Sequence, residues 1–209
     1  MITNVRQLLA AGLIVLGAGA SPALAQTGSL IGGVPDVPSN LEVEAGFILY
    51  SKGHAIGTQN YVCLPAATGV AWKFVAPQAT LYVPVLGLQA QLATHFLSPN
   101  PDEPGVARAT WQHSIDSSRV WAKATPEHTS TDANFVEPGA IPWLLLDVVG
   151  QEDGPDGGTF LSQAAFIQRL NTHGGQAPTT GCSVAANVGT VVLVPYTADY
   201  FFYKPRRQR

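Results

Sequence analysis

Charged side chains are scarce in this sequence. Asp, Glu, Lys and Arg make up 12% of the 209 residues, against about a quarter in an average domain. The first 25 residues contain Arg6 as their one charge, so the remainder has 10 basic and 14 acidic residues, a net charge of 10 − 14 = −4. This balance offers no basic surface for nucleic acid or anionic lipid. The basic tail, residues 205–209, is interpreted as a solvated end.

Cofactor-binding and hydrolase motifs are also missing. Beyond the N-terminal segment there is no Gly-rich phosphate loop, no G-x-S-x-G turn and no H-E-x-x-H helix. No later stretch approaches the roughly 20 apolar residues of a membrane-spanning helix. We therefore expect no cofactor, no nucleic-acid partner and no stable membrane insertion.

The N-terminus carries the pattern of a secretory signal. A positive charge at Arg6 precedes the uncharged run LLAAGLIVLGAGA, and small residues follow at Ala23 and Ala25. These features predict a signal peptide over residues 1–25, cleaved between Ala25 and Gln26. The mature chain is accordingly predicted to be secreted or periplasmic.

The rest of the chain has the composition of a β-protein. Its 21 glycines and 16 prolines separate short runs of strand-forming residues. This pattern predicts one all-β domain over residues 46–204, a β-sandwich or a β-barrel, preceded by a loose Pro- and Gly-rich arm over residues 26–45. The expected strands are Phe47–Ser51, Ala55–Leu64, Ala71–Val75, Leu88–Leu97, Arg108–Ile115, Arg119–Ala124, Ile141–Gly150, Thr190–Pro195 and Ala198–Tyr203.

One segment has a helical pattern. Leu161, Ala164, Ala165 and Ile167 in TFLSQAAFIQRL, residues 159–170, fall at roughly helical spacing. Two alanines favour a helix, whereas the flanking glycines leave a strand open. We predict one short helix here.

The stretch RLNTHGGQAPTTGC, residues 169–182, has two interpretations. Its glycines, histidine and threonines could surround an anion or a metal, or could form a rigid turn that leads to a disulfide. An exported chain with two cysteines most economically pairs them. A Cys63–Cys182 disulfide is therefore predicted, and the turn interpretation is favoured.

Ordered motifs run along nearly the whole mature chain. They are Tyr61-x-Cys63, Trp72-x-Phe74-x-x-Pro77, His95-Phe96, Thr110-Trp111, Ile141-Pro142-Trp143-Leu144-Leu145, Ile167-Gln168-Arg169-x-Asn171-Thr172-x-Gly174-Gly175 and Val194-Pro195-Tyr196-Thr197-Ala198-Asp199-Tyr200. In this succession the chain resembles the exported bacterial and fungal proteins grouped as domain-of-unknown-function family 3455. The resemblance implies an exported β-rich domain with a cysteine pair and carries no activity with it. Relative to the family pattern, 97–108 looks like an insertion, so a pocket near it could differ here.

The first functional hypothesis is a binding protein. Aromatic side chains inside a barrel, or between two sheets, could line a pocket for a small apolar or aromatic molecule. A structural role in the cell envelope or secretome is the alternative within this hypothesis, because most of the aromatics are expected in the core. The candidate ligand-binding residues are His95, Trp111, Trp143, Tyr61 and Arg169.

Two further hypotheses involve the histidines. His95, His113 and Asp116 lie in neighbouring predicted strands and could form a metal site in a metal-binding protein or metal-dependent enzyme. His95 with Asp116, aided by Arg169, could also serve acid–base catalysis, although no nucleophile stands out. Asp199 is expected to pair with a backbone turn or with Arg169.

Overall fold

The structure, a computed structural model, describes residues 33–207. The predicted signal peptide, 1–25, and the first part of the arm, 26–32, lie outside the described residues. Within this range no helix is long and apolar enough to cross a membrane. The elements are two single-turn 3-10 helices, η1 (Ser39–Leu41) and η2 (Ala185–Asn187), and the strands β1 (Phe47–Pro65), β2 (Val70–Val85), β3 (Leu88–Pro99), β4 (Ala107–His113), β5 (Arg119–Lys123), β6 (Thr129–Ser130), β7 (Trp143–Glu152), β8 (Phe166–Gly174) and β9 (Val191–Pro205).

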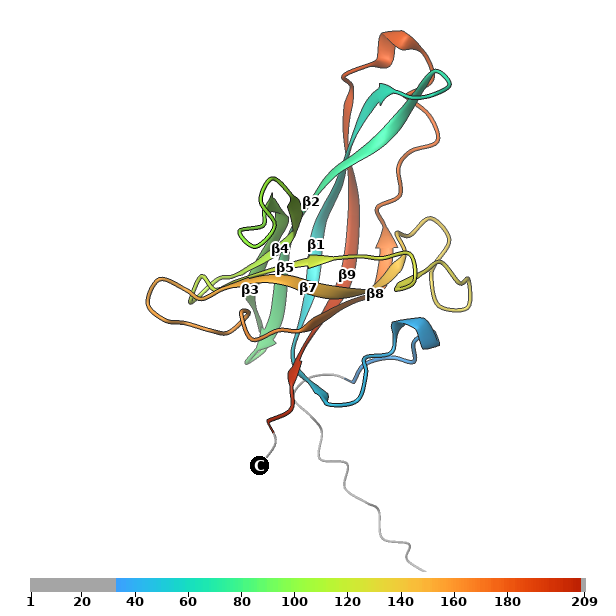
Figure 1. Cartoon of the computed structure of the whole chain (residues 1–209). Coiled ribbons are helices and arrows are strands. Elements are labelled where there is room, and N and C mark those ends of the chain that lie inside the picture. The colour runs from blue at the N-terminus through green and yellow to red at the C-terminus, as the bar shows by residue number, and fades with distance from the viewer. Residues whose placement is uncertain (1–32, 208–209) are drawn as a thin grey trace, which may run out of the picture.

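The strands close into a barrel. They lie in the order β5-β4-β3-β2-β1-β9-β8-β7-β6, with every pairing antiparallel. An additional pairing of β5 with β7 joins the two ends of an eight-stranded sheet (Figure 1), and β6 is an extra strand that pairs with β7. Closure leaves the central part of the sheet without free edges. The all-β prediction is confirmed, and of its two architectures the barrel is the one formed.

Side chains alternate between two buried faces, as the period of a strand requires. In β9, Tyr196, Ala198 and Tyr200 belong to the interior cluster, whereas Phe201 and Tyr203 belong to a second cluster on the outer face. Most of the buried apolar residues of the described chain are divided between these two clusters. Where both faces are covered, as in β7 and the last part of β9, the strand sequence is a continuous apolar run rather than an alternating one.

The N-terminal arm covers the outer cluster. Leu41 is completely buried against Trp143, Leu145 and Leu170, and its carbonyl oxygen accepts a 2.6 Å hydrogen bond from Gln168 Nε2. Figure 1 shows the described part of the arm in blue beside the barrel. The arm was expected to be loose, but over residues 33–45 this buried leucine and its hydrogen bond hold it against the sheet.

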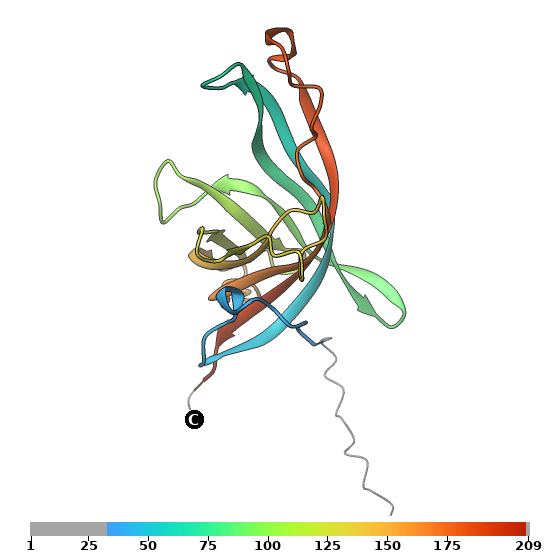
Figure 2. The same cartoon turned by 90° about the vertical axis from the view of Figure 1, so that its right-hand side faces the viewer.

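A three-stranded projection rises from one end of the barrel (Figure 2). It exists because β1 pairs with β2 as far as Pro65 and with β9 as far as Val62, whereas β2 meets β3 only from Ala79 and β9 meets β8 only from Tyr196. The expected breaks in β1 at Lys52-Gly53 and in β9 at Tyr196-Thr197 are therefore absent, because neighbouring strands continue the ladder through them.

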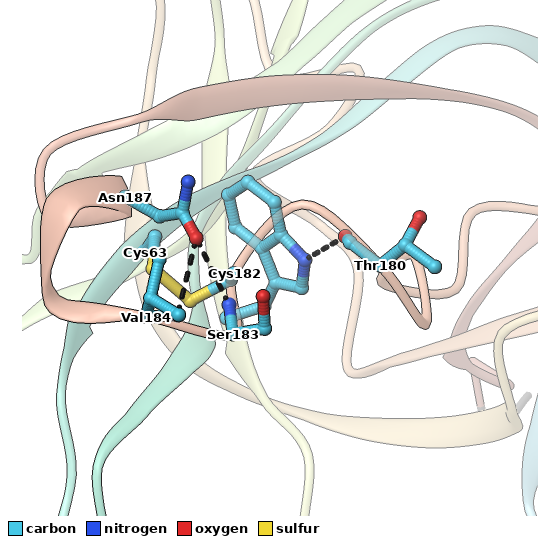
Figure 3. The surroundings of a disulfide bond; sticks show 7 residues. Cys63, Thr180, Cys182, Ser183, Val184 and Asn187 are labelled. Carbon is cyan, nitrogen blue, oxygen red and sulfur yellow. Dashed lines mark hydrogen bonds between the residues drawn. A yellow bond between two sulfur atoms is a disulfide. The ribbon is translucent and has the colours of Figure 1, made fainter.

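The predicted disulfide is present and ties the projection together. Cys63 and Cys182 are bonded with their Cα atoms 5.5 Å apart (Figure 3). The segment around Cys182 is held further by Asn187 Oδ1, which accepts the backbone N–H of Ser183 and Val184.

Two local predictions are corrected by the fold. The predicted helix over 159–170 is wrong: residues 160–163 form turns, and β8 begins at Phe166, where β7 and β9 pair with it on both sides. The stretch 169–182 is only partly a turn, since its first residues, up to Gly174, belong to β8.

Candidate functional site

The barrel encloses a cavity of about 230 Å³. Each of the eight strands that close the barrel contributes at least one residue to its wall. Leu144, Leu146, Ala109 and Ala122 supply much of the apolar surface. Three of the five predicted ligand-binding residues, His95, Trp111 and Arg169, line this one cavity.

His95 and Trp111 form one side of the cavity. They are opposite one another in the β3–β4 ladder, and their rings are stacked with centroids 4.1 Å apart and planes 10° apart. The Tyr200 ring packs against both, at 5.2 Å from His95 and 5.4 Å from Trp111. The wall is therefore a rigid aromatic surface to which a flat apolar molecule can pack.

His95 is held neutral. Burial of the imidazole lowers its pKa to about 3, although the hydrogen bond to the Thr110 carbonyl favours the charged form; the nearby Arg169 cation lowers the pKa further. His95 Nδ1 lies 2.9 Å from that carbonyl oxygen, which can only accept, so Nδ1 carries the proton. Nε2 of the neutral ring is consequently an acceptor.

Two buried donors of the wall have no acceptor. The Trp111 Nε1–H and the Gln59 Nε2 amide are both buried, and neither makes a hydrogen bond with any of the residues the structure describes. Trp111 is 1% exposed and Gln59 is 3% exposed. A buried donor left without a partner costs about 1–3 kcal/mol, so a molecule in the cavity that accepts these hydrogen bonds gains that free energy.

Arg169 brings a positive charge to the same wall. In the ladders of β8 it stands between Leu144 on β7 and Tyr200 on β9, both of which also line the cavity. Its guanidinium donates from Nε (3.2 Å) and Nη2 (2.8 Å) to the Pro142 carbonyl oxygen. Its other N–H groups are left for further acceptors.

The cavity opens where the projection leaves the barrel. Phe74 and Leu97 belong to its wall and are 52% and 38% exposed. Ala107 and Arg108, at the start of β4, complete this rim. The segment 97–108 thus contributes to the mouth of the cavity.

The other two ligand-binding candidates do not line the cavity. Tyr61 lies deeper in the projection, donates its hydroxyl to the Gly175 carbonyl oxygen at 2.7 Å and packs on Phe74 at a centroid distance of 5.7 Å. Trp143 lies on the outer face of the sheet, in the cluster beneath the arm, next to Phe135. The expected grouping of Trp143 with His95 and Trp111 is therefore not formed, because neighbouring Leu144 is the residue of β7 that points inward.

The predicted metal-ligand set is not gathered. His113 pairs its Nδ1 with Asp116 Oδ1 at 2.8 Å and stacks on Phe160 at 4.2 Å, whereas His95 packs on Trp111. Within residues 33–207 no three His, Cys, Asp or Glu side chains come together as a metal site requires.

Asp116 instead organises a turn. Burial opposes its ionisation, but hydrogen bonds from the Phe160 N–H, from the Ser118 hydroxyl and N–H, and from His113 keep the pKa of this carboxyl below its usual range.

The predicted partner of Asp199 needs correction as well. Its carboxylate accepts from His54 Nδ1 and Asn171 Nδ2, each at 2.9 Å, and forms a 3.0 Å ion pair with Lys52. It lies opposite His54 in the β1–β9 ladder, on the outward side of the strand from Tyr200. Because Arg169 points inward, the two side chains do not meet.

Two residues of the cavity wall, Gln59 and Lys123, were not among the candidates predicted from the sequence. Tyr200 was one of the aromatic residues expected to be able to line a pocket, and it does line the cavity, on the same inward face of β9 as Tyr196 and Ala198. No sequence pattern indicated Gln59 or Lys123, because the pairing register of β1 and β5 with their neighbouring strands decides which of their residues reach the cavity wall.

Comparison with known proteins agrees with the barrel's extent along the chain. Residues 45–204 match the family model described as "Protein of unknown function (DUF3455)". The chain matches no curated protein and no solved structure. Because the family match covers most of the chain, this protein belongs to the DUF3455 family.

Proposed function

We propose that this protein binds a small apolar or aromatic molecule inside its barrel. The observation that carries the proposal is an aromatic and aliphatic cavity whose wall includes Trp111 and Gln59, two residues whose side-chain nitrogens are buried without hydrogen-bond acceptors. Buried polar groups in folded proteins almost always have partners. A ligand with an acceptor atom supplies the missing partner and also fills the apolar space.

The size of the cavity limits the ligand. An apolar cavity of about 150 Å³ can hold benzene, and this one measures about 230 Å³. A single aromatic ring with a short substituent, or a short aliphatic chain, fits this space. The exposed rim at Phe74 and Leu97 gives such a molecule a route from solvent.

We propose further that binding takes place outside the cytoplasm, as the predicted signal indicates. The Cys63–Cys182 disulfide supports this location, because disulfides persist in oxidising compartments. The protein would then meet its ligand in the periplasm or the medium.

Native mass spectrometry of protein purified from the exported fraction tests this function. We expect a mass excess that disappears on denaturation and whose size identifies the ligand. Ala107 is exposed on the rim, so Ala107→Trp should block entry without disturbing the core and abolish the excess. Ala67→Trp, in the exposed turn between β1 and β2, is the matched control and should keep it. A bare mass, together with no binding of added small aromatic and aliphatic molecules, would overturn the proposal.

A further inference from the structure

The charges around the cavity have one sign. Arg108, Lys123 and Arg169 belong to its wall, and no Asp or Glu of the described residues does. The whole chain has a formal net charge of −3, so this grouping runs against its overall balance. Clefts lined by charges of one sign concentrate ligands of the opposite sign.

Arg169 has no counter-ion among the described residues. Arg108 is neutralised by Glu103, with bonds of 2.6 and 2.8 Å to its two carboxylate oxygens. Arg169, in contrast, forms no salt bridge with any carboxylate of residues 33–207, and its guanidinium donates to the Pro142 carbonyl oxygen. Burial lowers the pKa of His95, and the positive charge of Arg169 lowers it further. Burial raises the pKa of Tyr200, and the same charge opposes that rise. Arg169 therefore acts on the aromatic side of the cavity.

Several N–H groups of the residues on this wall have no acceptor. The Arg169 guanidinium, the Trp111 indole N–H and the Gln59 amide all lack acceptors for some of their N–H groups. A carboxylate is an acceptor only, carries the compensating charge and matches the planar fork of a guanidinium. The Leu144, Leu146 and Trp111 surfaces leave space beside it for an apolar body.

We infer that the ligand is a small monocarboxylic acid with an aromatic or short aliphatic body, bound as the anion with its carboxylate on Arg169. This inference rests on the proposed function and narrows it to one chemical class. The acid end lies at the donors, and the apolar end packs against the His95–Trp111–Tyr200 surface.

Calorimetric titration of matched probes tests the inference. The probes are benzoate, 3-phenylpropanoate and hexanoate, each compared with its neutral primary amide. A charge-assisted hydrogen bond is stronger than a neutral one, so the best acid should bind at least about tenfold more tightly than its amide. Added salt should weaken binding of the acid and leave the amide unchanged.

Two variants identify the residue that selects the charge. Arg169→Gln should remove the preference for acid over amide, and Arg169→Lys should retain part of it because the charge remains. Lys73→Gln, at an exposed position of β2 that does not line the cavity, is the matched control and should keep the preference. The comparison of acid with amide in the unchanged protein stands even where a variant fails to fold.

The outcomes separate the two proposals. Equal affinity for acid and amide would overturn the acid assignment and leave the binding function standing. Inorganic phosphate that competes as well as the best acid would also overturn it, since the site would then select charge without an apolar body. If no probe of either kind binds, the proposed function fails together with the inference.

Discussion

The imidazole of His95 lies parallel to the indole of Trp111, with ring centroids 4.1 Å apart, in the interior of the barrel. The Thr110 carbonyl fixes the histidine's protonated nitrogen and the β3–β4 ladder fixes the position of both rings. Their orientation is therefore set before any ligand enters. A preorganised wall of this kind reduces the conformational entropy lost on binding.

Acid should destabilise the protein through His95. Its folded pKa of about 3 lies below the ordinary value of 6.5, so the unfolded state takes up the proton first. The stability is fully present above pH 6.5 and is lost as the pH falls from 6.5 towards 3, by on the order of 1 kcal/mol per pH unit. Urea denaturation at pH 7, 5.5 and 4 measures this slope.

A His95→Gln variant serves as the comparison for that slope. It removes the titrating ring, so the difference in unfolding free energy between the two proteins should shrink as the pH falls. Every other titrating group is shared and cancels. A difference that stays constant from pH 7 to pH 4 would show that His95 does not become protonated on unfolding in this range.

Gly57 is predicted to be irreplaceable. A Cβ atom built there would lie 2.1 Å from the Gln78 carbonyl oxygen and 2.5 Å from the Ala79 Cα, both on the backbone of β2. Gly57→Ala should therefore lower the free energy of unfolding by about 1–3 kcal/mol or more, because backbone must move. Gly33→Ala meets no atom within 4 Å and is the control. Equal thermal midpoints for the two variants would contradict the close approach of β1 and β2.

Much of the fold could be predicted from the sequence, because strand-forming runs and Gly or Pro turns are local signals. The barrel's closure by β5 and β7 could not, since it depends on pairing between distant segments. The helix predicted over 159–170 failed for the same reason: Ala164 and Ala165 favour a helix locally, but Phe166 and Ile167 gain partners on both sides in the sheet.

The candidate site was predictable to a similar extent. His95, Trp111 and Arg169 were identified because each residue type suits ligand binding and each stood in a distinct motif. Trp143 was placed wrongly because IPWLLLD is apolar on both faces of its strand, so the sequence holds no period that tells inward from outward. Alternation is informative only where one face meets solvent.

The disulfide should stabilise the whole chain. Cys63 and Cys182 are separated by 119 residues, and closing so long a loop restricts the unfolded ensemble by about 4–5 kcal/mol on the chain-entropy model. A Cys63→Ser, Cys182→Ser double variant should therefore unfold at a much lower urea concentration than the oxidised protein.

The effect of a reductant completes that test. It should lower the urea midpoint of the unchanged protein towards that of the double variant and leave the variant's own midpoint where it is. Coincident midpoints of variant and oxidised protein would mean that the bond contributes nothing to stability.

The most direct test of binding inside the barrel is an NMR titration of the indole N–H signals. Trp72 donates to the Thr180 carbonyl, Trp121 donates to Ser98 Oγ, and Trp143 lies on the outer face, which leaves Trp111 as the indole in the cavity. A Trp111→Phe variant assigns its signal. With the acid and amide probes we predict that the Trp111 signal moves to a position typical of a hydrogen-bonded indole, while the other three stay in place. A Trp111 signal that no probe moves at millimolar concentration would contradict a ligand-binding barrel.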